Sequence, residues 1–446
     1  MTKLYQARWV LPVSAPPIAD GAIAVTGEKI VSVGTSSSLL AQFPEAATLD
    51  LGESAIIPGL INAHSHLELT AMRGFLEDET DFFAWLRKLT RARLERMTAD
   101  DLRVSASWGA CEAARAGVTC VADASDAALQ SMNALDDVGL RGIVFQESFG
   151  PDPRLAQENF EKLTEKISGL RERETSLVNV GVSPHAPYTV CSQQLQMISR
   201  FALDEKLPVM MHAAETEMEV ELLGQGKGPF AEGLKSRGIE WRAPGVSTIQ
   251  YLLEVGLLET RPLLAHCIHV DEVDLDTIKQ TATRVAHCPK SNVKLGHGVA
   301  PFHSMIQKGI DVGLGSDSVV SNNTCDLLEE ARFALLLARS RGSCDLNCDD
   351  VLRVATLGGA DSLGLTGKVG ELKEGLQADF AVVSLAGGHQ VPSYGPAETL
   401  IFASSGRDVT MTVVAGREVF RDGCVTTIDE ERLRARMNEI ARKLKA

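Results

Sequence analysis

The 446-residue sequence lacks an excess of basic residues. Lys and Arg together number 44 against 59 Asp and Glu, and the formal net charge is −15 at pH 7. Proteins that bind nucleic acids or anionic membranes usually present a basic surface. The composition therefore argues against both kinds of partner and is typical of a soluble globular protein.

Long apolar runs and paired cysteine motifs are also missing. No stretch approaches the roughly 18 apolar residues of a membrane-spanning helix. The N-terminus, MTKLYQARWVLPV, has no basic start followed by a long apolar stretch. The nine cysteines form no C-x-x-C pair, and Cys267 and Cys288 lie in apolar runs. We expect a cytoplasmic protein with buried, reduced thiols, no signal peptide and no membrane partner.

The patterns that are present predict an α/β fold. Short alternating runs before residue 57 and after residue 368 indicate β-structure at both ends of the chain. Between them, eight apolar runs alternate with longer helical segments, which predicts a (β/α)8 TIM-like barrel. These runs are 59–66, 117–125, 141–148, 178–185, 207–215, 261–267, 283–289 and 310–317.

Three segments follow from this pattern. We expect residues 1–57 to form the N-terminal half of a small β-sandwich and residues 58–368 to form the catalytic barrel. Residues 369–446 would supply the other half of the sandwich and a terminal helix. The connections after the first and fifth barrel strands are long, and such loops lie on the catalytic face. Within them, residues 67–90 and 216–245 are predicted to form the substrate pocket walls.

The first candidate ligands are His64 and His66, at the end of the first barrel strand. Side chains at positions i and i+2 of a strand point to the same side, so both imidazoles can reach one ion. Such a pair on its own is weak evidence, because surface or capping histidines produce the same spacing.

Other ionisable residues end later apolar runs. His212 follows LPVMM with Glu215 three residues on, His266 ends LLAHC, and Asp317 ends VGLGSD. Each one alone could be an ordinary polar residue at a strand end. The strand ends of a parallel barrel meet at one mouth, however, so together they predict a metal site. Histidines and a carboxylate suit Zn²⁺ first, and Fe²⁺ or Mn²⁺ as alternatives.

Longer motifs identify a family. PGLINAHSH, HAAET, AHCIHVD, CPKSNVKLGHGVAP and LGSDSVVSNN resemble the amidohydrolase superfamily, in particular its deaminase and chlorohydrolase branch. That branch includes S-adenosylhomocysteine and adenosine-type, guanine and cytosine deaminases and the triazine hydrolases. The resemblance extends over nearly the whole chain and includes GKVGELKEGLQADFAVV near its end.

The resemblance implies a role for each candidate residue. One divalent ion would be bound, and Glu215 would shuttle protons, His266 would orient the attacking water and Asp317 would also accept its proton. His185 would contact the substrate. Binuclear relatives place a lysine after the fourth strand, where this chain has Ser183-Pro184-His185, so one metal is expected. The implied ligands are His64, His66, His212 and Asp317.

The expected reaction is hydrolytic deamination of an aminated N-heterocycle. A bound divalent ion lowers the pKa of its water from about 16 towards about 7, which makes hydroxide available at neutral pH. Hydroxide attacks the ring carbon, Glu215 protonates the adjacent ring nitrogen, and ammonia leaves. Substrates such as adenosine derivatives or aminodeoxyfutalosine fit this chemistry.

The sequence defines the substrate less well than it defines the reaction. Trp85, with nearby phenylalanines, could stack on a flat ring or simply pack a helix. Adenosine-type relatives often have an acidic residue where this chain has Ala84, and Ser318-Val319 also departs from the usual pattern. HLELTAMRG and LLGQGKGPFAEGL resemble aminodeoxyfutalosine deaminases.

Alternatives remain for the reaction and for the other histidines. The same site could displace chloride or a thioether from a triazine-like ring, and a non-catalytic binding protein could share the fold. The family favours a homodimer. The remaining histidines fall into two groups: His269 and His287 are expected to be secondary to the site, and His297, His303 and His389 to be structural or exposed.

Overall fold

The computed structural model of the protein, which describes residues 1–445, contains all eight predicted barrel strands. Nearly every residue in them is buried, as expected for parallel strands covered by helices. They are β6 (Leu60–Ser65), β7 (Val118–Ser125), β8 (Arg141–Ser148), β9 (Val178–Pro184), β10 (Met210–Ala213), β11 (Leu263–His266), β12 (Arg284–His287) and β13 (Val312–Leu314).

These strands form two four-stranded parallel sheets, β6-β7-β8-β9 and β10-β11-β12-β13. Isolated parallel bridges connect the two sheets at both edges: Val182 pairs with Val209, and Ser65 pairs with Asp317. The carboxyl ends of all eight strands therefore face the same way, which brings the predicted site residues to one side of the fold.

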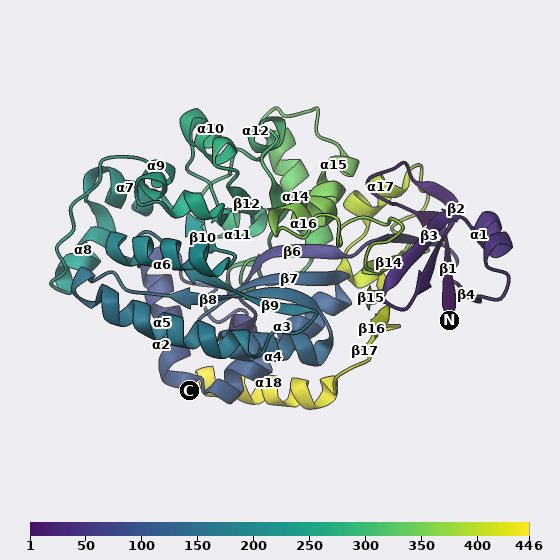
Figure 1. The fold of residues 1–446 in the computed structure, drawn as a ribbon, viewed down its shortest axis with the longest axis horizontal. Coiled ribbons are helices and arrows are strands. Elements are labelled where there is room, and N and C mark those ends of the chain that lie inside the picture. Colours follow the sequence, from purple (N-terminus) through teal and green to yellow (C-terminus); the bar gives the residue numbers. More distant parts are fainter. Residues whose placement is uncertain (446) are drawn as a thin grey trace.

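Helices cover the outside of the strands (Figure 1). Thr98 and Asp101 form a capping box at the start of α3, which satisfies backbone N–H groups in its first turn. The α-helices of this region are α2 (Phe82–Arg96), α3 (Ala99–Arg115), α4 (Ala128–Val138), α5 (Ala156–Arg171), α6 (Ser192–Glu205), α7 (Glu217–Gln225), α8 (Gly228–Ser236), α9 (Thr248–Glu254), α10 (Glu272–Gln280), α11 (Pro289–Lys294), α12 (Phe302–Gln307), α13 (Val319–Asn322), α14 (Leu327–Ser340), α15 (Cys348–Arg353) and α16 (Gly359–Ser362).

Short turns of tighter or wider helix complete the connections. They are η1 (Leu67–Met72), η2 (Pro153–Leu155), η3 (Leu257–Thr260), η4 (Val354–Gly358), η5 (Thr399–Ala403) and η6 (Gly406–Asp408). Of these, η1 directly follows His66 and starts the long connection after β6.

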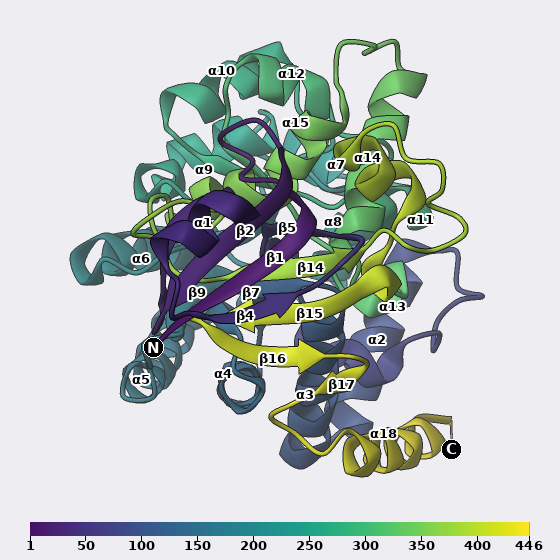
Figure 2. The same cartoon turned by 90° about the vertical axis from the view of Figure 1, so that its right-hand side faces the viewer.

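Both ends of the chain contribute to one nine-stranded sheet, which Figure 2 views face on. Its order is β17-β16-β15-β14-β5-β1-β2-β3, with β4 paired to β1, and the antiparallel pair β5–β14 joins the two ends. The strands form a single hydrogen-bonded sheet, and the sandwich arrangement stays a prediction. They are β1 (Thr2–Val10), β2 (Ile18–Thr26), β3 (Lys29–Thr35), β4 (Ala47–Asp50), β5 (Ser54–Pro58), β14 (Phe380–Ser384), β15 (Val409–Val414), β16 (Arg417–Arg421) and β17 (Cys424–Val425).

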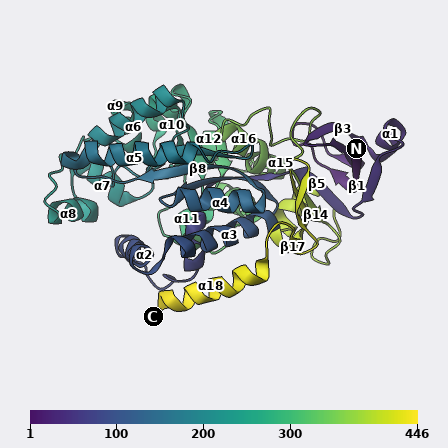
Figure 3. The same ribbon diagram turned by 60° about the horizontal axis from the view of Figure 1, so that its bottom comes forward.

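Three further helices belong to the terminal segments: α1 (Ser36–Gln42), α17 (Pro396–Glu398) and α18 (Glu430–Lys445). The last is the terminal charged helix expected from the sequence, and it lies along the barrel beside α3 (Figure 3). Ion pairs fix it there, because Glu430 binds Arg115 and Lys443 binds Asp101.

Two predictions based on composition can be compared with the fold. All nine cysteines are free, and Cys267 and Cys288 are buried. Among residues 1–445, no helix combines the length and apolar character needed to cross a bilayer.

Candidate functional site

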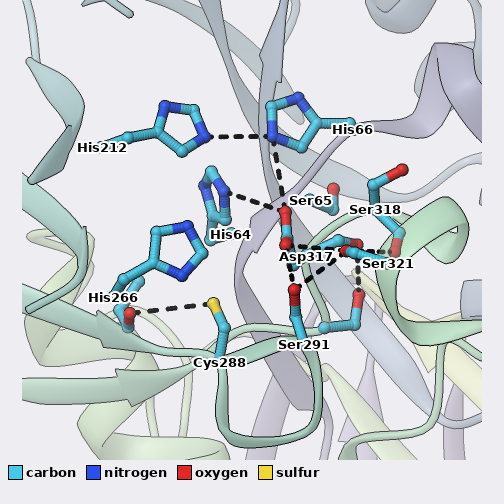
Figure 4. A network of polar contacts seen from close by, with 12 residues as sticks. His64, Ser65, His66, His212, His266, Cys288, Ser291, Asp317, Ser318 and Ser321 are labelled. Atoms are coloured by element: carbon cyan, nitrogen blue, oxygen red, sulfur yellow. Dashed lines mark hydrogen bonds and ion pairs between the residues drawn. The ribbon is translucent and has the colours of Figure 1, made fainter. Parts of the chain in front are cut away.

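Four of the predicted side chains converge at the carboxyl ends of the strands (Figure 4). His64 and His66 come from the end of β6, His212 from β10, and Asp317 follows β13. Asp317 Oδ1 lies 3.4 Å from His64 Nε2 and 3.5 Å from His66 Nε2, and the Nε2 atoms of His66 and His212 are 3.2 Å apart. Residues separated by up to 253 positions thus share one small volume.

The imidazoles present lone pairs to this volume. His212 Nδ1 donates to the backbone oxygen of His185 over 2.9 Å, which leaves Nε2 unprotonated. Burial and the neighbouring His64 lower the pKa of His66 to about 3, so its imidazole is neutral and its Nε2 can be the unprotonated nitrogen. With lone pairs on both Nε2 atoms, the two rings can bind a cation placed between them.

The donor set fits a divalent ion. Around a tetrahedral zinc with bonds of about 2.0–2.1 Å, neighbouring ligand atoms lie about 3.3–3.4 Å apart, close to the separations seen here. His64 Nε2 is also buried without a hydrogen-bond partner. The arrangement therefore fits a divalent ion bound by three neutral imidazoles and one carboxylate.

Backbone geometry and hydrogen bonds orient Asp317. Its φ is 56°, in the left-handed region that is costly for residues other than glycine and recurs at functional sites. Its Oδ2 accepts hydrogen bonds from the hydroxyls of Ser291 and Ser321. Nearby, a Cβ at Gly315 would lie 2.8 Å from the Cβ of His64, so only glycine leaves room for that imidazole.

Glu215 and His266 lie beside the four residues. His266 Nε2 is 3.7 Å from Glu215 Oε1, and His266 Nδ1 donates to Asn292 Oδ1 over 2.8 Å. Burial, followed by the charge of Asp317, raises the pKa of Glu215 to about 8. That shift favours the protonated carboxyl group, which can donate a proton.

The remaining histidines can be placed in the fold. His297, expected to be structural or exposed, has a largely buried side chain, and its Nε2 lies 3.6 Å from Glu215 Oε1. His287 stacks on Phe302, away from these contacts. His303 and His389 pair with Asp345 and Asp408 instead.

A cavity of about 470 Å³ lies against these groups, a size within the roughly 300–1,000 Å³ usual for ligand pockets. Residues from the predicted wall 67–90 line it, Trp85 of α2 among them. His185 lines it as well, with its Nδ1 2.9 Å from Thr189 Oγ1.

The second predicted wall, 216–245, is wrong, since none of its residues lines the cavity. Helix α8 lies behind the cavity: Phe230 stacks on Tyr188 at 4.1 Å, and Tyr188 faces the cavity. The ends of β7 and β8 take its place, with Asp126, Glu147 and Phe149 among the lining residues. The sequence analysis did not identify Glu147.

Comparisons with known proteins agree with this geometry. The sequence model of the amidohydrolase family matches residues 55–419. A 5-methylthioadenosine/S-adenosylhomocysteine deaminase of Syntrophobacter fumaroxidans is 33% identical over 431 residues, which cover 95% of this chain and 94% of the relative. A protein of the same name from Pyrococcus furiosus is 33% identical over 419 residues, or 93% of each chain.

Solved structures show the same fold. An adenosine deaminase from Xanthomonas campestris with bound zinc has a TM-score of 0.88 and 26% identity, and the match covers 99% of this chain and 98% of that one. A guanine deaminase from C. acetobutylicum has a TM-score of 0.79 at 22% identity, covering 94% of this chain and 100% of its own, which shows the fold alone. From its family match, its relatives and its fold, this chain belongs to the amidohydrolase family.

Proposed function

We propose that the protein is a metal-dependent hydrolase that removes an amino group from a purine-like heterocycle as ammonia. The observation that carries this proposal is the convergence of three histidines and Asp317, with the buried Glu215 beside them, at one cavity. The full-length similarity to proteins named as deaminases of adenosine-type compounds supports the same chemistry.

Under this proposal His64, His66, His212 and Asp317 hold one divalent ion. Zinc is the first choice because the donors are neutral imidazoles and a carboxylate, with iron and manganese as alternatives. The zinc bound in the Xanthomonas campestris neighbour supports that choice. When bound, the ion supplies the Lewis acidity that activates water at neutral pH.

The surrounding side chains accept and donate the protons of the reaction. Asp317 accepts the proton of the attacking water, since its carboxylate faces the same volume as the imidazoles. His266 orients that water, with its ring held by Asn292. Glu215 gives its proton to the ring nitrogen beside the attacked carbon, which makes that carbon more electrophilic. His185 and Trp85 contact the heterocycle from the cavity wall.

We also propose that the two four-stranded sheets act as one closed (β/α)8 barrel spanning residues 58–368. The edge bridges Val182–Val209 and Ser65–Asp317 support closure. Residues 1–57 and 369–446 then form the accessory domain, joined through β5 and β14.

Zinc-loaded protein should release ammonia from at least one compound in a panel of aminated purines, nucleosides, cytosines and pterins. Ammonia and the hydroxylated product are measured together, with metal-free protein as the control. Parallel assays of chloride and thiol release from substituted triazines test the alternative leaving groups. The proposal is wrong if no compound in the panel yields ammonia.

A further inference from the structure

A cluster of carboxylates lies at the cavity, where η1 begins and where β7 and β8 end. Glu68, Asp126 and Glu147 line the cavity, and Asp123 belongs to the same cluster. Glu68 is 2% exposed, Asp123 0% and Glu147 7%. Such a concentration of buried acid requires neutralising partners.

Three of the four carboxylates have such partners. Arg93 lies 3.2 Å from Asp126 Oδ2 and 4.0 Å from Glu68 Oε1. Asp123 Oδ1 accepts hydrogen bonds from the backbone N–H of Leu67 and the hydroxyl of Ser65, over 2.7 and 3.0 Å. Lys166 Nζ also lies 3.2 Å from Asp126 Oδ1. Both cations thus already pair with Glu68 or Asp126.

Glu147 differs from the other three. Glu68 Oε2, Asp123 Oδ2 and Glu147 Oε1 are all buried without a hydrogen-bond partner. Within residues 1–445, however, Glu147 alone of the four also has no ion pair within 4.0 Å and no side-chain hydrogen bond on its other oxygen. Burial raises the pKa of Glu147 well above its usual range, and the charges of Glu68 and Asp126 raise it further. A buried polar group without a partner is costly in the free protein, and a donor on a ligand would remove that cost.

The position of Glu147 in the cavity indicates where the donor group of a bound ligand would lie. Its carboxylate oxygen and the ring nitrogens of His185 and His212 lie within 4.8 Å of one another, and Glu147 lines the cavity. It therefore lies beside the metal centre and not at the cavity entrance. His266 and Glu215 come from β11 and the end of β10, whereas Glu147 ends β8.

We infer that Glu147 is a specificity-determining residue that accepts a hydrogen bond from a hydroxyl group of the substrate. The inference rests on the proposed function and narrows its substrate class to purine compounds that carry such a hydroxyl group.

Two substitutions at Glu147 test its role as an acceptor. Glu147→Ala removes the acceptor and is expected to raise KM for adenosine roughly 10–100-fold, with a smaller change in kcat. Glu147→Gln keeps an acceptor oxygen and should restore most of the KM. Glu112→Gln, outside the cavity and paired with Arg73, is the matched control.

Adenine and 2′,3′-dideoxyadenosine identify the donor. If the 2′- or 3′-hydroxyl binds Glu147, the dideoxy compound has the same KM in the wild type and in Glu147→Ala. If the 5′-hydroxyl binds it, the dideoxy compound loses affinity as adenosine does. Adenine, which has no sugar hydroxyl, has the same KM in both proteins in either case. Calorimetry with adenosine on metal-free protein gives the same comparison without turnover, and binding should weaken roughly 10–100-fold in Glu147→Ala.

The outcomes distinguish this inference from the proposed function. Absence of ammonia from the whole panel rejects the proposed function, while calorimetry still tests Glu147. Unchanged KM and unchanged adenosine binding in Glu147→Ala overturn the inference alone. Loss of bound zinc in Glu147→Ala also overturns it, because Glu147 would then serve the metal and not the substrate.

Discussion

Replacing Glu215 by glutamine is expected to lower kcat for ammonia release about 10²–10⁴-fold while the protein keeps its metal. The amide has the shape of the acid but cannot pass a proton to the ring nitrogen. Steady-state ammonia release and metal analysis of the same preparation measure both quantities. The wild-type rate should also fall as pH rises through the pKa of about 8 that burial gives Glu215, since the carboxylate cannot donate.

A bound cation would move that alkaline fall to lower pH without changing its direction, because positive charge favours the carboxylate. Unreduced activity of Glu215→Gln would contradict the assignment of Glu215 as the proton donor. Loss of the metal in this variant would instead make Glu215 a ligand. Binding of the deaminated product, measured by calorimetry, serves as the control for an intact cavity.

Replacing His212 by alanine is expected to weaken metal binding by at least about 100-fold and to abolish measurable turnover. Even residues that only support metal ligands typically change affinity by about 10–100-fold, and His212 is proposed to bind directly. Its Nε2 lies 3.2 Å from that of His66, so its removal leaves a gap in the donor set. Metal content after gel filtration and a competitive chelator titration measure the effect.

His303→Ala is the matched control, since His303 pairs with Asp345 far from the strand ends. It should keep full metal content and activity. A circular dichroism spectrum of His212→Ala that matches the wild type separates ligand loss from unfolding. Full metal occupancy in His212→Ala would show that the ligand assignment is wrong.

The sequence predicted the barrel strands well because parallel strands buried on both faces keep continuous apolar runs. It overestimated their length where the backbone turns. The run 207–215 contains only β10, Met210–Ala213, because Ala214 adopts a φ of 51° and leaves the strand. That turn is set by the packing of the site, which no local pattern records.

The cavity walls were harder to predict than the metal centre. The sequence analysis did not single out Glu147, although it lies near the end of an apolar run as Asp317 does. Only the structure shows that Glu147 has no partner among the described residues. His297 lies in a loop whose path depends on tertiary contacts, including the ring of Phe82 at 4.4 Å. Residues 216–245 were assigned to the wrong place because loop length alone does not say which side of a helix faces the substrate.

The most direct test of the central claim is a zinc titration of chelator-treated protein, followed by ammonia release from the best substrate of the panel. One ion held by His64, His66, His212 and Asp317 predicts that activity is absent without metal, rises linearly and reaches its plateau at one equivalent of zinc. Activity in the metal-free protein, or a plateau only at two equivalents, would contradict a single metal centre at this site.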